Sequence, residues 1–307
     1  MLAVDRGIGY HASVKDASEQ PPGNPTPEES NAAPFRVFFL IRWWRWLRFL
    51  SHVAVAVFMV GLVFPRVSAA RRNALTGWWA RKLLRIMGIV LSPHGAVPDA
   101  DARNLIIASN HVSWVDIFVI SAAHPALFIA KSEIRDWPIA GFICERAGTI
   151  FIRRARRRDT AVINETMHRV LSEGYTVGFF PEGTTTPGDK LLKFHTSLFE
   201  PAVVNNATLL PVALRYRSED GQPCPAIAFV GEISFVESVG LMLSQRKMIA
   251  EVTFAPPLAA GSFTRRELAS QAEASVAAIL DVPLPSTHQR FPLEGVPDSL
   301  FPVRLTG

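Results

Sequence analysis

The chain has 307 residues, of which 49% are apolar, so it is long enough to bury the core of one sizeable catalytic domain. A formal net charge of +5 favours anionic partners such as phospholipid headgroups, phosphorylated substrates or nucleic acid, without choosing among them. With only two cysteines, Cys144 and Cys224, the sequence excludes a disulfide framework and a cysteine-rich zinc site, and it fits a reducing compartment.

The first 34 residues are acidic and proline-rich. They carry five acidic side chains and no basic-then-apolar order of the kind that marks a secretory signal. Such a composition does not bury enough apolar surface to fold on its own. We therefore expect residues 1–34 to form a disordered extension.

Arginines and tryptophans then interleave, which is the composition of a membrane-interface belt. The uncharged run Phe49 to Phe64 would span about 24 Å as a helix, against about 30 Å for a hydrocarbon core. Residues Ala69 to Leu91 form a basic amphipathic pattern suited to the headgroup layer. We predict a membrane-associated helical pair over 35–92, one helix of which is a candidate for a transmembrane span. The alternative is two ordinary core helices.

Beyond Pro98, short apolar runs alternate with helical patterns. One such helix begins at Asp159 as its N-cap and ends at Gly174. The alternation predicts an α/β domain over 93–281 with a mixed central sheet flanked by helices, followed by a C-terminal tail over 282–307. The expected strands are 104–109, 126–130, 149–152, 176–180, 208–215 and 226–230.

The motif NHVSWVD places His111 and Asp116 directly after a predicted buried strand. Sites gather at the carboxyl ends of strands in open α/β sheets. On a continuous helix, residues five apart lie about 140° from each other, so the pair can meet only if His111 lies on the turn before the helix. Asp116 could then hold one imidazole nitrogen while the other accepts a proton. Taken alone, the spacing is a weak signal and fits a structural histidine better than a catalytic one.

A second motif, FFPEGTTT, follows another predicted strand. Gly183 permits close backbone approach, while Glu182 and Thr184 supply an acceptor and a hydroxyl at a turn that can bind an anion. By itself this motif is also explained by a plain Pro-Gly turn.

Between the two motifs, five arginines fall within six residues, beginning with Arg153 and Arg154. Guanidinium groups can clamp a phosphate through paired hydrogen bonds. The alternative is a solvated basic run, an interpretation that suits the last three arginines better than Arg153.

Taken together, these blocks resemble the glycerolipid acyltransferase family, which includes the bacterial 1-acylglycerol-3-phosphate acyltransferases. The resemblance covers roughly Leu84 to Val230. It implies an enzyme that moves a fatty acyl chain from acyl-CoA or acyl carrier protein to the sn-2 hydroxyl of 1-acylglycerol-3-phosphate, giving phosphatidate in phospholipid biosynthesis. The matching blocks, in order, are His111 with Asp116, Phe151-Ile152-Arg153-Arg154, Phe180-Pro181-Glu182-Gly183-Thr184 and Leu210-Pro211-Val212-Ala213-Leu214.

The resemblance also implies a role for each matching residue. His111 would be the general base on the acceptor hydroxyl, and Asp116 would orient it. The remaining matched positions would bind or shape the site for the acceptor: Arg153, Arg154, Glu182, Gly183, Thr184 and Pro211. No metal and no organic cofactor is expected. The implied partners are the acyl donor, a lysolipid acceptor and membrane lipids but no nucleic acid, and the implied location is the cytoplasmic side of the inner membrane.

The sequence departs from the family pattern after Glu-Gly-Thr. Thr185 and Thr186 stand where Arg-Ser is common, and His195 and Ser197 stand where a cation and a glycine are common. Fewer fixed positive charges weaken the case for lysophosphatidate, and a related branch that acylates a lyso-ornithine lipid has a similar form. That lysolipid is the alternative acceptor.

Two rival functions follow from the same residues. A metal-dependent hydrolase would use His111, Asp116 and Glu182, but the sequence lacks a second histidine at a tight ligand spacing. A non-catalytic basic protein that binds membrane surfaces would need the arginines but neither motif. Cys144 is a weak candidate nucleophile because no motif places a base beside it.

Overall fold

The computed structural model describes residues 38–99, 102–152 and 159–285 of the chain. The predicted extension 1–34 lies outside these residues, as do Arg153, Arg154 and most of the predicted tail 282–307. The predicted helical pair and nearly all of the α/β domain lie within them.

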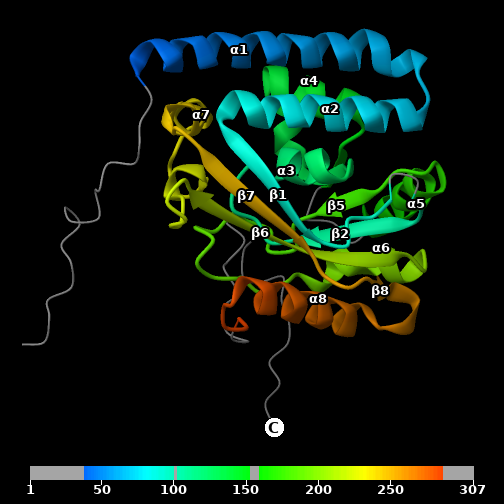
Figure 1. Ribbon diagram of the computed structural model, residues 1–307. Helices are drawn as coiled ribbons and strands as arrows, with labels where there is room; N and C mark the ends of the chain where they lie inside the picture. The colour runs from blue at the N-terminus through cyan, green and yellow to red at the C-terminus, as the bar shows by residue number, and fades with distance from the viewer. Residues whose placement is uncertain (1–37, 100–101, 153–158, 286–307) are drawn as a thin grey trace, which may run out of the picture. The chain divides into compact units, whose positions relative to one another are not determined.

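The central element is a mixed sheet in the order β1-β7-β6-β2-β5-β3-β4, with the short β8 paired to β6 (Figure 1). Neighbouring strands are parallel except where β6 pairs with β7 and β8. The predicted class, α/β with a mixed central sheet flanked by helices, is confirmed. The strands are β1 (Ile89–Gly95), β2 (Leu105–Ser109), β3 (Leu127–Lys131), β4 (Ile150–Ile152), β5 (Val177–Phe179), β6 (Thr208–Ser218), β7 (Met248–Phe254) and β8 (Leu258–Ala259).

Helices cover both faces of the sheet, with α2 and α3 on one side and α6 and α8 on the other (Figure 1). Side chains of β6 alternate between the two hydrophobic cores: Leu214 and Tyr216 join the core under α2 and α3, while Ala213 joins the core over α8. The longer helices are α1 (Phe39–Phe58), α2 (Ala69–Met87), α3 (Asp116–Ala123), α4 (Pro138–Ala147), α5 (Asp159–Ser172), α6 (Glu200–Val204), α7 (Phe235–Ser244) and α8 (Arg265–Leu280).

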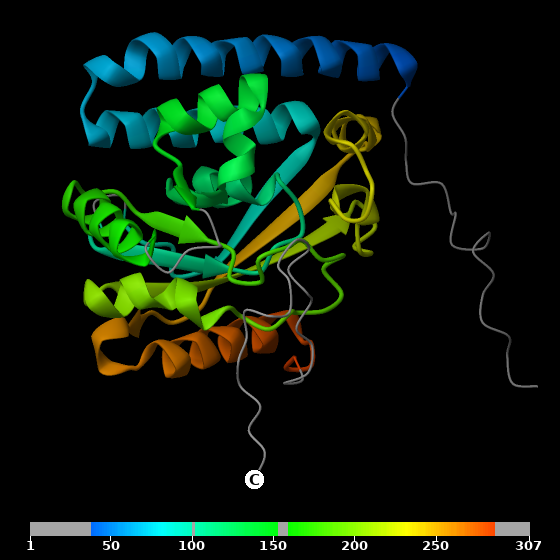
Figure 2. The same cartoon turned by 180° about the vertical axis from the view of Figure 1, so that it is seen from behind.

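Helix α1 rests with one face on the rest of the domain. It runs on through a π-helical turn (Met59–Val63) and a 3-10 turn (Phe64–Arg66), and it contacts α2, α4 and α7 (Figures 1 and 2). The guanidinium group of Arg45 donates hydrogen bonds to carbonyls at the end of α7, including one of 2.5 Å to Gln245. The opposite face of α1 is apolar and exposed, with Trp43 at 63% and Trp44 at 59%.

Helix α2 is shorter and more buried than the sequence predicts. Ser68 caps its start, and Gly88, in the left-handed conformation at φ 78°, ends it. The prediction that the helix extends to Leu91 is wrong, because Ile89–Gly95 forms β1 and pairs with β7. The apolar side of α2 packs into the core of the domain. On that side α2 is an ordinary core helix, which is the alternative that the sequence analysis left open. The buried residues are Gly77, Trp79, Ala80, Leu83, Leu84, Ile86 and Met87.

Five of the six predicted strands are confirmed, as is the helix that begins at Asp159. The prediction of a strand at 226–230 is wrong. Pro225 starts a 3-10 turn (Pro225–Ile227), and the segment that follows crosses the site instead, where Phe229 donates its backbone N–H to Val112 at 2.9 Å. Strands β1, β7 and β8 were not predicted.

Candidate active site

The two motifs meet at the carboxyl ends of β2 and β5, which are neighbours in the sheet. The NHVSWVD segment leaves β2 at Asn110. The side chain of Asn110 continues the strand pairing, since its amide group donates to the Leu214 carbonyl at 3.0 Å and its oxygen accepts from the Leu214 N–H at 2.8 Å. The start of this loop is therefore fixed to β6 before the chain turns.

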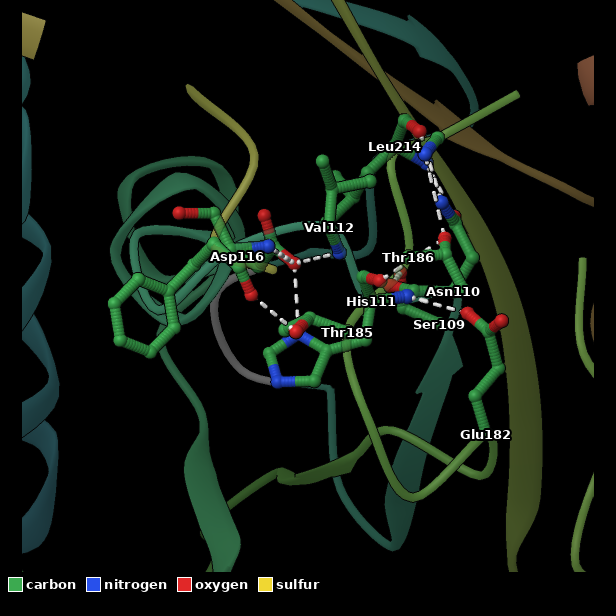
Figure 3. A network of polar contacts seen from close by, with 12 residues as sticks. Ser109, Asn110, His111, Val112, Asp116, Glu182, Thr185, Thr186 and Leu214 are labelled. Atoms are coloured by element: carbon green, nitrogen blue, oxygen red, sulfur yellow. Dashed lines mark hydrogen bonds and ion pairs between the residues drawn. The ribbon is translucent and has the colours of Figure 1, made fainter. Parts of the chain in front are cut away.

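His111 and Asp116 form a hydrogen-bonded pair (Figure 3). His111 Nδ1 lies 2.8 Å from Asp116 Oδ2 because α3 begins only at Asp116, which leaves His111 on the preceding turn. The same oxygen accepts the backbone N–H groups of Val112 at 2.7 Å and Ser113 at 2.9 Å. The turn that brings the pair together is thus held by the carboxylate itself.

Two contacts hold the imidazole of His111: the hydrogen bond at Nδ1 and a stacked aromatic ring against its face. Its ring stacks on Phe180 with centroids 4.0 Å apart, and Phe180 in turn stacks on Phe128. Gly178 makes room for Phe128, since a Cβ at that position would lie 2.6 Å from the ring. The His111 side chain remains 19% exposed, and among the described residues nothing hydrogen-bonds to its Nε2. That nitrogen is available to a substrate.

Glu182 binds the backbone of the loops and not the open side of the site. Its Oε1 accepts the N–H of His111 at 2.7 Å, and its Oε2 accepts the N–H of Leu192 at 2.8 Å. Thr186 completes the attachment by donating its N–H to the His111 carbonyl at 2.8 Å (Figure 3). Burial raises the pKa of Glu182 to about 8, and the two amide hydrogen bonds only partly offset that effect.

The other predicted site residues lie around this centre. Gly183 forms a turn at φ 76°, Thr184 is exposed at its tip, and Thr185 donates its hydroxyl to the Phe229 carbonyl. Pro211 is buried in β6, opposite Ala108 of β2. Proline has no N–H to donate to a neighbouring strand. Pro211 lies between the part of β6 that pairs with β8 and the part that pairs with β7, so no hydrogen bond between strands is lost there.

A second buried carboxylate holds the segment beyond the FFPEGTTT motif. Glu273 of α8 accepts the N–H of Phe194 and the ammonium group of Lys193, each at 2.7 Å. Since Leu192 binds Glu182, alternate residues of one short segment are fixed by two carboxylates. No local pattern signals this contact, because Glu273 lies about eighty residues away along the chain.

The described residues hold no group of three or more potential metal ligands. A cavity of about 380 Å³ lies elsewhere, near the amino ends of β3 and β5, and is lined by Arg72, Arg135 and Arg169 among others.

Known proteins are similar to this chain in sequence. A sequence model described as Acyltransferase matches residues 90–215. A lyso-ornithine lipid O-acyltransferase of Pseudomonas aeruginosa is 35% identical over 205 residues, which are 67% of this chain and 78% of that protein. A 1-acyl-sn-glycerol-3-phosphate acyltransferase of Neisseria meningitidis serogroup B is 34% identical over 238 residues, 76% of this chain and 92% of that protein. The chain belongs to the acyltransferase family.

The fold of this acyltransferase is also similar to a solved structure. The crystal structure of the 1-acyl-sn-glycerophosphate (LPA) acyltransferase PlsC from Thermotoga maritima matches with a TM-score of 0.59 at 20% identity, covering 79% of this chain and 94% of that one. The predicted resemblance is confirmed, and the chain is an enzyme that transfers acyl groups.

One residue of the acyltransferase site was missed by the sequence analysis. Tyr216 of β6 donates its hydroxyl to Asp116 Oδ1 at 2.5 Å. It lies one hundred residues beyond Asp116 inside an apolar strand, where a tyrosine looks like any core aromatic. The alternation along β6 could have placed it on the same face as Leu214, but not opposite Asp116.

We predict that Glu182→Gln flattens the pH dependence of stability. The pKa of Glu182 is raised from its ordinary value of 4.5 to about 8 in the folded chain. Between those values the folded state keeps a proton that the unfolded state loses. The wild-type free energy of unfolding should therefore fall, by on the order of a few kcal/mol, as pH rises from about 5 to about 8. Denaturant unfolding across this range measures the slope.

The surface variant Glu200→Gln is the control for the loss of a carboxylate and should keep the wild-type slope, since Glu200 lies on α6 paired with Arg265. An unchanged slope in Glu182→Gln would contradict the assignment of this pH dependence to Glu182.

Proposed function

We propose that this acyltransferase moves a fatty acyl chain from acyl-CoA or acyl carrier protein to the sn-2 hydroxyl of 1-acylglycerol-3-phosphate, giving phosphatidate for phospholipid synthesis. The observation that carries the proposal is the pair formed by His111 and the buried Asp116, with a 2.8 Å hydrogen bond at Nδ1 and a partly exposed ring. Such a pair is a base and its orienting group.

The reaction follows from this geometry. His111 Nε2 removes the proton from the acceptor hydroxyl as its oxygen attacks the thioester carbonyl carbon. A C–O bond forms, the carbonyl becomes an oxyanion, and Asp116 stabilises the imidazolium. Collapse of the intermediate breaks the C–S bond, and His111 returns the proton to the departing thiolate. A positioned base of this kind contributes roughly 10²–10⁴-fold in rate.

Glu182 supports this chemistry through the backbone. Because its carboxyl group accepts the His111 N–H while Thr186 donates its N–H to the His111 carbonyl, the motif fixes the loop on which His111 stands. We propose Arg153 and Arg154 as the groups that bind the acceptor's phosphate, on the strength of their match to the family motif. We also propose, from the same match, that Gly183 and Thr184 contact the acceptor from the turn that follows β5.

A lyso-ornithine lipid is the second candidate acceptor. Proteins similar to this chain carry both names, lyso-ornithine lipid O-acyltransferase and 1-acyl-sn-glycerol-3-phosphate acyltransferase. The structure adds a specific observation, since Thr185 and Thr186, which stand where Arg-Ser is common, bind the carbonyls of Phe229 and His111. Threonine carries no positive charge, so these two positions supply no cation to an acceptor headgroup, as an arginine there would.

We further propose that α1 lies in the plane of the cytoplasmic face of the inner membrane. The helical stretch Phe39–Arg66 is long and apolar enough to cross a bilayer by length and composition. Its inner face, however, packs on α2, α4 and α7, and Arg45 is bound to the end of α7. A helix that crossed the bilayer would have to leave these contacts. An in-plane helix keeps them and places its exposed tryptophans at the headgroup level.

The proposed function predicts that His111→Ala abolishes transfer of a labelled acyl chain while His168→Ala, a surface histidine of α5 bound to Asn205, retains it. Purified proteins would be offered lysophosphatidate and lyso-ornithine lipid separately. Loss of at least about 10²-fold in turnover is expected on whichever acceptor the wild type uses. Wild-type transfer to lyso-ornithine lipid alone would replace the proposed acceptor, and full activity of His111→Ala would refute the mechanism.

The in-plane placement predicts that the double variant Trp43→Ser and Trp44→Ser loses much of its binding to liposomes in a sedimentation assay. Both side chains are exposed on the outer face of α1, and their loss removes apolar area from the interface. Val204→Ser, an exposed apolar residue of α6 on the other side of the sheet, should sediment as the wild type does. Equal sedimentation of all three proteins would contradict the placement.

A further inference from the structure

The carboxylate of Asp116 has two oxygens with different partners. Oδ2 accepts from the His111 ring and from the backbone N–H groups of Val112 and Ser113. Oδ1 accepts from the phenol of Tyr216 at 2.5 Å. Asp116 is fully buried and Tyr216 is nearly so, which makes this side-chain contact a feature of the core and not of the surface.

We infer that Tyr216 is a positioning residue of the transfer reaction, the third member of a His111–Asp116–Tyr216 chain that fixes the rotation of the Asp116 carboxylate and moderates the charge it presents to His111. The inference rests on the proposed function for its effect on catalysis. Its physical basis does not, because the hydrogen bonds exist in the resting enzyme.

The phenol acts as a donor throughout. Burial raises the pKa of Tyr216 well above its ordinary value, and the neighbouring charge of Asp116 adds to the effect. The hydroxyl therefore keeps its proton at any pH at which the enzyme works. With the phenol protonated, Oδ1 is satisfied, and Oδ2 is held toward the imidazole.

Loss of the hydroxyl would alter both roles. Oδ1 would be a buried acceptor without a donor, and the carboxylate could rotate away from its position against Nδ1. The remaining charge would also be less neutralised, so it would favour the protonated imidazole more strongly. His111 would then titrate at higher pH than in the wild type, and part of its orientation would be lost.

The other described charged groups around His111, Asp116 and Tyr216 have partners of their own. Glu182 approaches from the FFPEGTTT loop and is bound to backbone amides. Arg81 of α2 donates to the Ala122 carbonyl at the far end of α3. Arg215, Arg217 and Glu251 lie on the β6 and β7 face that turns away from α3, where Arg217 pairs with Glu251 at 3.0 Å. Among the described residues, His111 and Tyr216 are therefore the two side chains that hydrogen-bond to Asp116.

The test compares Tyr216→Phe with Tyr175→Phe. Both replace a buried tyrosine, but Tyr175 belongs to the core on the other side of the sheet. We expect Tyr216→Phe to lower kcat by about tenfold while both KM values stay within about twofold, and to move the midpoint of the acid limb of the kcat profile to higher pH. Tyr175→Phe should change neither. Equal profiles for the two variants would overturn the inference.

A second readout does not depend on turnover. NMR of labelled histidine, with the His111 signal assigned from His111→Ala, follows the imidazole in the resting enzyme. Tyr216→Phe should move the His111 titration midpoint upward by roughly half to one pH unit. If this shift is found in a protein that transfers no acyl chain, the proposed function fails and the Tyr216 contact stands. If the midpoint stays in place, the inference fails whatever the activity.

A further variant covers the case in which Tyr216→Phe does not fold. The sequence has only three tyrosines, Tyr10, Tyr175 and Tyr216, so 3-fluorotyrosine can replace them all during expression with little change in shape. The fluorinated phenol is the stronger donor, and it should lower the His111 midpoint in the wild type and in Tyr175→Phe alike. An unchanged midpoint in both would overturn the inference.

Discussion

A fully buried carboxylate organises this active site. Asp116 lies in the core under α2 and α3, where an isolated charge would cost several kcal/mol, and it is stable there because four donors surround it. Two of these are the N–H groups of the turn that follows His111, one is the His111 ring, and one is Tyr216. The requirement to satisfy the charge therefore shapes the turn and aligns the imidazole at the same time.

The second motif holds the same histidine from the other side. Glu182 and Thr186 take up the N–H and the carbonyl of His111, and Glu182 also binds Leu192. The base is thus attached to β2 and β5 through its backbone and to α3 through its ring. Such a preorganised arrangement spends little free energy on reorientation during the reaction.

Much of this was accessible from the sequence, because the key groups lie in short motifs at strand ends. To predict the pairing of His111 with Asp116, it was enough to place the start of α3 after His111. The two motifs lie together because β2 and β5 are neighbours in the sheet. Tyr216 and Glu273 were not accessible, since each is joined to the site by strand register or helix packing over long separations. The strand predicted at 226–230 failed for a local reason, the turn that Pro225 begins, and β1 was hidden in the pattern of the preceding helix.

In the proposed mechanism acyl transfer is direct, with His111 as a base and without an acyl-enzyme. Rapid mixing of the purified protein with a radiolabelled acyl thioester, in the absence of any acceptor and followed by denaturation, tests this most directly. Direct transfer predicts that the protein carries no covalent label and that thiol release begins only when the lysolipid is added. One equivalent of acyl chain bound to the protein, on Cys144 or on His111 itself, would contradict it.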